Sequence, residues 1–382
     1  MIKTKVLILI PSLIGGGAER ALVNLLNNLD FNQYDVDLAV VSYHGVYKNK
    51  IPNHVKVIPL FTNSLLVRIL AYAQKRIGVT WPFRWAVRSK ITATYNTSIC
   101  YLDSNFTDLL FFVKKSGRKI SWVHSSYKTN PNFYRFFSND KYRRKLILNR
   151  YSKLDAIVFV SEDCKKEFEE IFGSYANMPV IYNLIEKEQL LRGKNEFVIE
   201  QSRKISFVAV GSLLPVKGYD KLIEAASMLK NEGLDFEVKI LGEGMLKEEL
   251  QSQINESRLG GIVKLLGFYQ NPYPFMASAD VFIMTSISEA LPLALCEAIT
   301  LGKAVLVTNC SGCREIVDQG KYGLFAEQTS KGIAMKMREV LLNKSLITYY
   351  EGKALERSNI FDKRIVIDNF SKILDGNLYS GL

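Results

Sequence analysis

Short, almost entirely apolar runs alternate along this chain with longer segments in which apolar residues recur at helical spacing. In the first half, the apolar runs predict six strands, Lys5–Ile10, Val36–Ser42, Val55–Leu60, Thr97–Leu102, Lys119–His124 and Ala156–Ser161. The segment after the first strand places four leucines on one helical face, Leu22, Leu25, Leu26 and Leu29. Apolar strands that alternate with helices indicate a parallel sheet with helices on both faces.

The same alternation begins again at Ile205, after a polar stretch at 186–204 that has no clear period. It predicts six further strands, Ile205–Val210, Glu237–Leu241, Val263–Leu266, Val281–Met284, Ala304–Thr308 and Gly323–Ala326. Helices are expected between several of them, at Tyr219–Lys230, Leu246–Ser257 and Pro274–Ser278.

Two such series predict the α/β class, with two Rossmann-like domains that face each other. The length of 382 residues also exceeds what one ordinary core accommodates. The expected domains are 1–185 and 205–362, with 186–204 as the linker. A final helix in 363–382 is expected to cross back to the N-terminal domain.

No apolar run reaches the roughly 18 residues that a membrane-spanning helix needs. The N-terminal residues MIKTKVLILIPSLIGGG resemble a signal peptide only in part, because the apolar core is short and no cleavage site follows. Five cysteines in a chain of this length indicate a reducing compartment rather than a disulfide framework. We therefore expect a cytoplasmic protein.

Positive charge is concentrated in the first half of the chain. Residues 1–190 hold 27 Lys and Arg against 15 Asp and Glu, whereas the remaining residues hold 23 of each. The segment Leu65–Lys90 mixes Leu, Ile, Trp and Phe with Arg and Lys and contains no acidic residue. Two interpretations stay open. The segment is either a pair of interfacial helices that bind an anionic surface, at the inner face of the plasma membrane, or a core element with a solvated basic face.

The stretch Val281–Phe325 holds the most specific candidate site. After its first strand, Glu289 precedes Pro292, which is expected in the first turn of a helix that runs to Gly302. A helix start without a side-chain cap has N–H groups that suit a phosphate. Glu297 lies more than a turn inside this otherwise apolar helix, where a carboxylate needs a polar partner.

A loop that contains glycine follows the first strand of each half. The triglycine at 15–17 permits close approach of the backbone to a diphosphate or sugar, although it does not match the G-x-G-x-x-G dinucleotide fingerprint. The loop at 211–218 contains Lys217, which can place an ammonium group on a phosphate. A tight turn and an ordinary surface lysine are the alternatives for these two features.

Three other side chains carry reactive groups. His124 ends a predicted strand, so we expect its side chain in the ligand crevice of the N-terminal domain, with a hydrogen-bonded core histidine as the alternative. Cys310 and Cys313 form a C-x-x-C on a loop after a strand, and no second ligand pair for zinc accompanies them. A structural tight turn is therefore favoured over a redox role, and no clustered Asp and His predict a metal site.

Three stretches together resemble the retaining glycosyltransferases of family 4, the group 1 glycosyltransferases with the GT-B fold. They are IPSLIGGGAERALVNL, VGSLLPVKGYDKLIEA followed by ILGEGMLKEEL, and SEALPLALCEAITLGKAVLVTNCSGCREIVDQGKYGLF. With WVHS and IYNL, the resemblance covers nearly the whole chain, and Glu289 and Glu297 match the E-x7-E pattern of the family. Two positions depart from it. Ser212 stands where an Arg is frequent, and Ala290 stands where a Gly is frequent, which would strain the turn if it needs a positive φ.

The resemblance implies a role for each matched side chain. Glu297 would bind the ribose hydroxyls of a nucleotide-sugar, and Glu289 would orient the donor sugar. Lys217 would hold the diphosphate and offset charge on the departing nucleotide, as its main cation, because Ser212 is uncharged. His124 would lie near the reacting sugar and the acceptor.

The resemblance also implies roles for the backbone. N–H groups between Ala290 and Leu293, Leu291 included, would receive the phosphates. Gly16 and Gly17 would close on the diphosphate from the N-terminal domain.

The resulting hypothesis is a transferase that moves one sugar, with retention, from a nucleotide-sugar, UDP-linked, to a lipid-linked or polysaccharide acceptor in cell-surface glycan synthesis. Fixed donors would stabilise the leaving diphosphate, so neither a metal nor a cofactor is expected. A sugar-nucleotide epimerase of the same fold is the first alternative, and a nucleotide-binding oxidoreductase is the second. A nucleic-acid-binding protein is the third, and nucleic acid is not expected as a partner because no binding module is recognisable.

Overall fold

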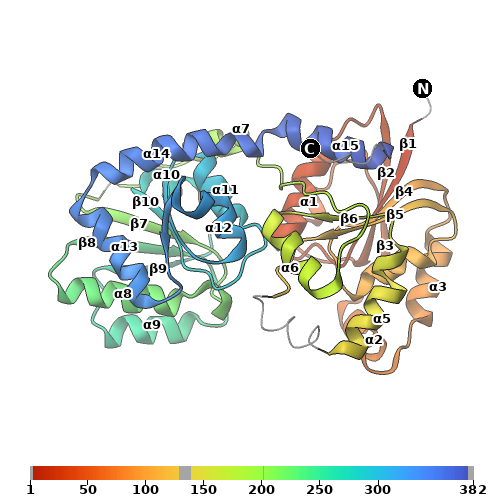
Figure 1. Cartoon of the computed structure of the whole chain (residues 1–382), viewed down its shortest axis with the longest axis horizontal. Coiled ribbons are helices and arrows are strands. Elements are labelled where there is room, and N and C mark those ends of the chain that lie inside the picture. Colours follow the sequence, from red (N-terminus) through yellow and green to blue (C-terminus); the bar gives the residue numbers. More distant parts are fainter. Residues whose placement is uncertain (1–2, 129–138, 201, 377–382) are drawn as a thin grey trace. The chain divides into compact units, whose positions relative to one another are not determined.

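The computed structural model describes residues 3–128, 139–200 and 202–376. By the contacts between its residues, the chain divides into two compact units (Figure 1). Unit 1 consists of three segments of the chain. The first ends at Tyr127, the second ends at Leu184, and the third begins at Lys363. Unit 2 holds Ile185–Asp362. Within the described residues, no helix combines the length and the apolarity needed to cross a bilayer.

Unit 1 is built on six strands, β1 (Thr4–Ile10), β2 (Tyr34–Ser42), β3 (Lys56–Phe61), β4 (Tyr95–Cys100), β5 (Ser116–Val123) and β6 (Ala156–Phe159). Their order across the sheet is β3-β2-β1-β4-β5-β6, and all neighbouring pairs are parallel. The segment Val6–Ile10 of the central strand has no exposed surface. Burial on both faces explains why this strand is an unbroken apolar run in the sequence.

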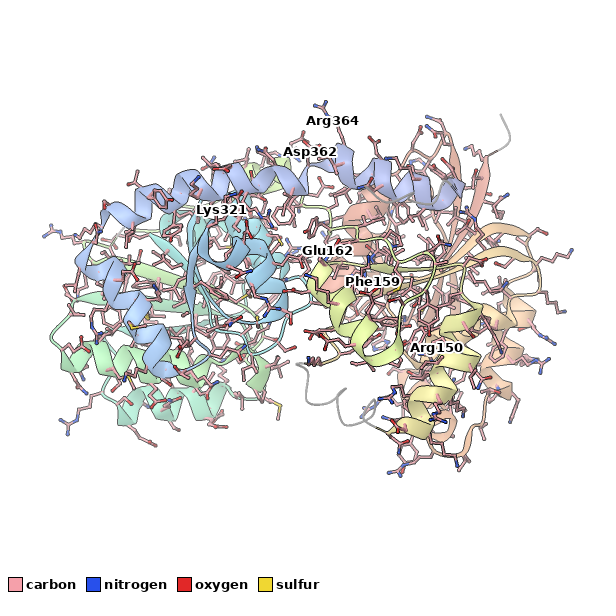
Figure 2. All side chains as sticks on the ribbon, in the orientation of Figure 1. Arg150, Phe159, Glu162, Lys321, Asp362 and Arg364 are labelled. Atoms are coloured by element: carbon pink, nitrogen blue, oxygen red, sulfur yellow. The ribbon has the colours of Figure 1, made fainter. Side chains whose placement is uncertain are left out.

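Helices connect these strands. They are α1 (Gly17–Asn28), α2 (Ser64–Ile77), α3 (Trp81–Lys90), α5 (Asp140–Asn149) and α6 (Glu162–Phe172), with the 3-10 helices η1 (Lys48–Lys50), η2 (Asn105–Phe112) and η3 (Tyr151–Lys153). The predicted leucine face of α1 is buried. Phe159, which is labelled in Figure 2, ends β6 and packs against Phe168 of α6, with 5.1 Å between the ring centroids.

The C-terminal helix α15 (Lys363–Asp375) belongs to unit 1 and lies beside β1 (Figure 1). The ring of its Phe370 lies 5.5 Å from that of Trp122 on β5. Arg118, also on β5, donates hydrogen bonds to backbone carbonyl groups near the end of α15. The predicted return of the C-terminal helix to the first domain is therefore confirmed.

Unit 2 is built on β7 (Ile205–Val210), β8 (Phe236–Leu241), β9 (Val263–Gly267), β10 (Val281–Met284), β11 (Ala304–Thr308) and β12 (Leu324–Ala326). All pairs are parallel, in the order β12-β11-β10-β7-β8-β9. If the strands are counted from the first of each unit, the two sheets have the same order, that of a doubly wound fold. The predicted α/β class with two Rossmann-like domains is confirmed.

The helices of unit 2 are α7 (Lys187–Gly193), α8 (Tyr219–Asn231), α9 (Lys247–Glu256), α10 (Tyr273–Ser278), α11 (Leu293–Thr300), α12 (Ser311–Val317), α13 (Ser330–Leu342) and α14 (Ser345–Arg357). Its 3-10 helices are η4 (Pro215–Lys217), η5 (Asp318–Gly320) and η6 (Ser358–Phe361).

Helix α7 lies within the stretch 186–204 that the sequence analysis assigned to the linker, and the sequence did not predict a helix there. The sequence shows no period there because Leu190 is the single buried residue of this helix. The helix is held to the segment before α10, where the side chain of Asn271 donates to the carbonyl oxygen of Gly193 at 2.8 Å. One buried side chain cannot reveal a helical period, so tertiary contacts define this helix.

Candidate active site

An ion pair between Lys217 and Glu289 lies at the carboxyl edge of the unit 2 sheet. Lys217 ends the 3-10 helix that follows β7, and Glu289 lies in the loop after β10, the neighbouring strand. Lys217 Nζ is 2.6 Å from Glu289 Oε1, and the hydroxyl of Ser286 donates to the same oxygen at 2.8 Å. This edge is the switch point of the doubly wound sheet, where such folds bind ligands.

A backbone hydrogen bond and a side-chain hydroxyl hold the two loops together. Ile287 N donates to Val216 O at 2.8 Å, and Thr285 Oγ1 donates to Lys217 O at 2.9 Å. Gly218 has φ +63°, and a Cβ there would lie 2.4 Å from the carbonyl oxygen of Thr285. Only glycine fits this position, so the V-K-G sequence places the lysine as well as supplying it.

Lys217 remains an ammonium group in this setting. Burial alone would lower its pKa, but the charge of Glu289 and the hydrogen bond to it outweigh burial and raise the pKa above its ordinary value. The two side chains are 20% and 14% exposed, so both reach the surface. Lys217 has three N–H donors, and a further anion can therefore bind beside Glu289.

The turn from Glu289 to Pro292 answers the question about Ala290 and corrects the predicted place of Pro292. Ala290 is not among the described non-glycine residues with positive φ, so the alanine does not strain this turn. Helix α11 begins at Leu293, and Pro292 is its N-cap rather than part of its first turn. No side chain caps the helix, as expected, because proline and the preceding Leu291 have no side-chain acceptor.

Gly312 supports this turn and was not anticipated as a site residue. Its N–H donates to the carbonyl oxygen of Glu289 at 3.0 Å, and a Cβ on it would lie 2.5 Å from the carbonyl oxygen of Ala290. The available signal was the glycine inside C-S-G-C directly after a strand, because close backbone approach is a use of glycine that no other residue shares.

The two cysteines that flank Gly312 are not on a tight turn, in contrast to the prediction. Cys310 is the N-cap of α12, and Cys313 lies in the first turn of that helix. Both are buried free thiols, and Cys313 Sγ lies 3.6 Å from Met284 Sδ. Burial raises the pKa of Cys313 well above its ordinary value, whereas a redox-active thiol needs a lowered one.

Glu297 is buried in the second turn of α11 and is held by a tyrosine. The hydroxyl of Tyr273, in α10, donates to Glu297 Oε1 at 3.1 Å. The expected polar partner of this carboxylate is therefore Tyr273, which the sequence analysis did not single out. Ser212 lies exposed in the loop after β7, and its carbonyl oxygen accepts from Leu214 N at 2.8 Å. Lys217 is the one cation in 211–218.

The triglycine loop of unit 1 connects β1 to α1. Gly15 has φ +133°, Gly16 is the N-cap of α1, and Gly17 is its first residue. The buried carboxylate of Glu19 accepts hydrogen bonds from the N–H groups of Gly16 and of Glu19 itself. Burial raises the pKa of Glu19, and these two hydrogen bonds partly oppose the rise.

Glu19 is therefore a third residue that the sequence did not single out, after Gly312 and Tyr273. A glutamate three residues after an N-cap commonly reaches back to the N-cap N–H, which was the available signal. Its carboxylate occupies the N–H group of Gly16, one of the two glycines that the family resemblance places against a diphosphate.

His124 directly follows β5. Its ring lies 4.8 Å from that of Tyr101, and within the described part of the chain its buried Nε2 has no hydrogen-bond partner. Burial lowers the pKa of His124 to about 3, so the ring is neutral at pH 7. The ring can donate or accept a hydrogen bond, but it does not supply positive charge.

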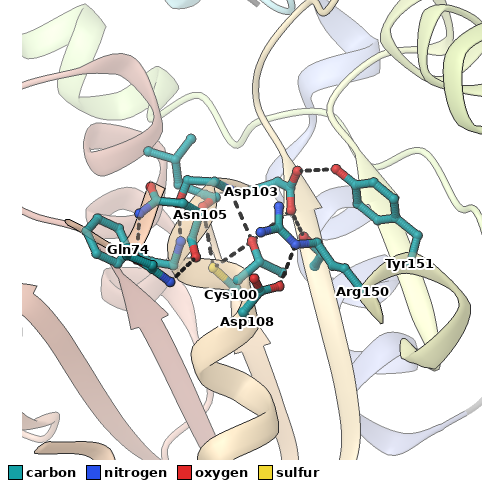
Figure 3. A network of polar contacts seen from close by, with 12 residues as sticks. Gln74, Cys100, Asp103, Asn105, Asp108, Arg150 and Tyr151 are labelled. Carbon is teal, nitrogen blue, oxygen red and sulfur yellow. Dashed lines mark hydrogen bonds and ion pairs between the residues drawn. The ribbon is translucent and has the colours of Figure 1, made fainter. Parts of the chain in front are cut away.

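A buried polar network fixes the loop that follows β4 in unit 1 (Figure 3). The carboxylate of Asp103 accepts hydrogen bonds from Thr107 and Ser121 at 2.7 Å each, from Tyr151 at 3.0 Å and from Tyr127. Four protein donors satisfy this carboxylate, so it holds the loop and is not a candidate base. Among the described residues, no group of three or more His, Cys, Asp and Glu side chains could hold a metal ion.

Two family models match the chain. The model described as "Glycosyltransferase Family 4" matches residues 15–189, and the model described as "Glycosyl transferases group 1" matches residues 193–356. The second match contains Lys217, Glu289 and Glu297, and the first begins at the triglycine loop.

Two relatives from Campylobacter jejuni resemble the chain. One is "N-acetylgalactosamine-N,N'-diacetylbacillosaminyl-diphospho-undecaprenol 4-alpha-N-acetylgalactosaminyltransferase", 31% identical over 244 residues, which cover 62% of this chain and 65% of the relative. The other is "N,N'-diacetylbacillosaminyl-diphospho-undecaprenol alpha-1,3-N-acetylgalactosaminyltransferase", 26% identical over 279 residues, which cover 72% of this chain and 67% of the relative.

Among solved structures, Anabaena Alr3699/HepE in complex with UDP and glucose aligns with a TM-score of 0.72. The alignment covers 98% of this chain and 100% of that chain, at 18% sequence identity. At this identity the likeness shows the fold.

Proposed function

Because the chain belongs to the group 1 glycosyltransferases with the GT-B fold, we propose that it transfers one sugar from a UDP-sugar to a lipid-linked or polysaccharide acceptor. The observation that carries this proposal is the Lys217–Glu289 pair beside the uncapped start of α11. The Campylobacter relatives are named for transfer to undecaprenol-diphosphate-linked sugars, which supports the lipid-linked class. UDP in the HepE complex supports the choice of nucleotide.

Lys217 has the chemistry that the leaving group requires. As a sugar leaves a nucleotide diphosphate, negative charge develops on the phosphate oxygens, and fixed donors that point at this charge lower the barrier. The side chain of Lys217 is held by Glu289, and its backbone carbonyl oxygen accepts from the hydroxyl of Thr285, so the lysine needs little reorganisation. The N–H groups at the start of α11 add a second positive pole.

The two glutamates take unequal parts in the proposal. Glu289 accepts hydrogen bonds from the hydroxyls of the donor sugar and so orients it, and it also fixes Lys217. Glu297 binds the ribose hydroxyls, with Tyr273 setting the orientation of its carboxylate. His124, Gly16 and Gly17 keep the roles that the family resemblance implies, with His124 acting as a neutral hydrogen-bonding group.

Further parts of the proposal concern stereochemistry, cofactors and location. The anomeric configuration is retained, as the family resemblance implies. Lys217 serves as the cation on the diphosphate, so the transfer proceeds without a metal ion or cofactor. We place the protein in the cytoplasm, bound at the inner face of the plasma membrane, because a lipid-linked acceptor lies there.

A binding screen followed by one substitution tests the function. UDP-, GDP- and ADP-sugars are compared by thermal shift, and the largest stabilisation is expected from a UDP-sugar. The substitution Glu297→Gln removes charge-assisted hydrogen bonds and should therefore lower the affinity for the nucleotide-sugar donor about tenfold to a hundredfold. Glu249→Gln, on exposed helix α9, is the matched control.

Two results would contradict the proposal. Unchanged turnover in Glu297→Gln would show that the site is wrongly assigned. An epimerised nucleotide-sugar, formed from donor alone, would identify the first alternative enzyme class.

A further inference from the structure

Helix α2 of unit 1 exposes an apolar stripe. Leu65, Ile69 and Tyr72 recur at the spacing of one helical face, and they are 62%, 58% and 64% exposed. The opposite face packs on unit 1 and contains buried Val67 and the polar Gln74. The usual arrangement of an amphipathic surface helix, with its apolar face inward, is therefore partly reversed.

The inward position of Gln74 is specific. Gln74 Oε1 accepts from Asn105 Nδ2 at 3.0 Å, and Gln74 Nε2 donates to Asn105 O at 3.4 Å (Figure 3). At the N-terminus of α2, Asn63 caps the helix by accepting from Leu66 N at 3.0 Å, and Gly78 ends it with φ +73°. The helix is thus anchored and capped without use of its outer apolar stripe.

Helix α3 continues the same kind of surface. Trp81 and Trp85 are 71% and 64% exposed, and together with Arg84, Arg88 and Ser89 they line an open depression. The opposite face of α3 is buried in the core of unit 1 through a separate set of residues, Pro82, Phe83, Ala86 and Val87. Contiguous exposed apolar patches mark protein or membrane interaction sites, and these two tryptophans line one depression on a helix whose other face is buried.

The charge of the two helices selects the class of partner. The segment 64–90 contains six Lys and Arg and no Asp or Glu. Arg76 lies over the ring of Tyr72 at 5.6 Å, so basic and aromatic groups share one face. Basic groups attract an anionic surface, while Leu, Ile and Trp favour the apolar layer directly beneath lipid headgroups.

We propose that the outer faces of α2 and α3, here named the α2–α3 face, dock on an anionic lipid bilayer. Leu65, Ile69, Trp81 and Trp85 enter the headgroup region, and the arginines and lysines contact lipid phosphates. This docking proposal rests on the proposed function, because a lipid-linked acceptor lies in such a bilayer. A nucleic acid would use the positive charge and leave the aliphatic stripe without a role.

The test uses the full chain and its own tryptophans. The chain has three, and the third, Trp122, is buried at 2% exposure. Vesicles of phosphatidylcholine mixed with phosphatidylglycerol should shift the emission of Trp81 and Trp85 to the blue, and vesicles of phosphatidylcholine alone should shift it less. In the variant Trp81→Phe/Trp85→Phe, the remaining emission should not respond.

Vesicle co-sedimentation measures the contribution of each helix. Leu65→Ser/Ile69→Ser and Arg84→Glu/Arg88→Glu should each lower the bound fraction about tenfold, the change expected when several interfacial contacts are lost. Two control pairs alter exposed residues of unit 2 and should bind as the unmodified chain does, Met335→Ser/Leu342→Ser and Lys331→Glu/Lys344→Glu.

Specific outcomes overturn the docking face. They are equal binding to vesicles with and without phosphatidylglycerol, unchanged binding in both α2–α3 variants, or tighter binding to a duplex oligonucleotide than to vesicles. A UDP-sugar thermal shift on the same variants separates this proposal from the proposed function, because the donor site lies in unit 2. Vesicle binding without a UDP-sugar shift would leave the docking face standing and contradict the proposal of a UDP-sugar as the donor.

Discussion

Units 1 and 2 share one strand order and differ in the chemistry at its switch point. In unit 2, the loops after β7 and β10 bring together a lysine and a glutamate that lie 72 positions apart. In unit 1, the loop after β1 carries three glycines whose helix start is closed by Glu19, and His124 follows β5 as a neutral ring. The same scaffold therefore holds an ion pair in one unit, and in the other a glycine loop closed by a carboxylate together with a neutral histidine.

The difference shows what the sheet supplies and what the loops supply. Parallel strands bring their carboxyl ends to one edge in both units, and this is independent of the residues that follow them. The function then depends on loop residues with few permitted replacements, such as Gly218 and Gly312, whose added Cβ would collide with backbone. Substitutions in these loops should therefore have different effects in unit 1 and in unit 2.

The largest effect is expected when the cation of unit 2 is removed. Lys217→Ala should lower kcat about 10²–10³-fold, since one fixed donor on a developing charge is worth about 3–4 kcal/mol. Lys264→Ala, an exposed lysine on β9 of the same unit, is the matched control and should leave kcat unchanged. The measurement is UDP-sugar turnover, and a wild-type kcat in Lys217→Ala would contradict the charged site.

A methyl group on a glycine should affect unit 2 more than unit 1. In Gly312→Ala the new Cβ would meet the backbone oxygen of Ala290 at 2.5 Å, and overpacking of this kind costs about 1–3 kcal/mol. In Gly16→Ala it would meet a carboxylate oxygen of Glu19 at 2.4 Å, and that side chain can move. Thermal unfolding and turnover of both variants provide the comparison. Equal losses would show that the two loops are equally constrained.

A smaller effect is expected from the cap in unit 1. Glu19→Ala leaves the N–H of Gly16 without its acceptor and should cost about 1 kcal/mol of unfolding free energy, the usual value of a lost cap. Glu19→Gln retains an acceptor oxygen and serves as the control, with a loss of about half that size. Denaturant unfolding measures both. A large loss of UDP-sugar binding in Glu19→Ala, with stability intact, would give Glu19 a role beyond the cap.

The smallest effect concerns His124 and acidic pH. The folded-state pKa of about 3 lies below the ordinary value of 6.5, so the unfolded chain binds a proton first as the pH falls. The free energy of unfolding therefore decreases as the pH falls through 6.5. Between pH 7 and pH 6 the decrease is about 0.7 kcal/mol. His124→Gln should abolish this part of the pH dependence, which unfolding at the two pH values measures. An unchanged difference between those values would show that His124 is not the group that titrates.

The strands were predictable because both sheets are buried on both faces. A fully buried parallel strand needs an unbroken apolar run, as in Val6–Ile10, and few other elements produce one. Helix α7 escaped prediction because its burial depends on a single leucine. The start of α12 escaped because its N-cap is Cys310, a residue without a capping preference, so the loop appeared to continue into the helix.

The sequence singled out residues of the candidate site but not the contacts between them. Lys217, Glu289 and Glu297 were singled out from their places beside predicted strands and helices, and the family resemblance then implied a role for each. Neither source states that Lys217 pairs directly with Glu289. Side-chain partners such as Tyr273 lie on other elements, so spacing along the chain cannot reveal them. Glu19 had a local signal, the capping pattern, and its burial depends on the tertiary packing of the loop.

The return of α15 to unit 1 has a consequence for how the protein is made on the ribosome. The segment Ile185–Asp362 of unit 2 is synthesised between the body of unit 1 and the helix that supplies Phe370 to Trp122. Unit 2 can therefore reach its final packing while nascent unit 1 still exposes the β5 surface that α15 will cover. Unit 1, which has the more positive charge, therefore completes its folding last, after residues 185–362 of unit 2 have been synthesised.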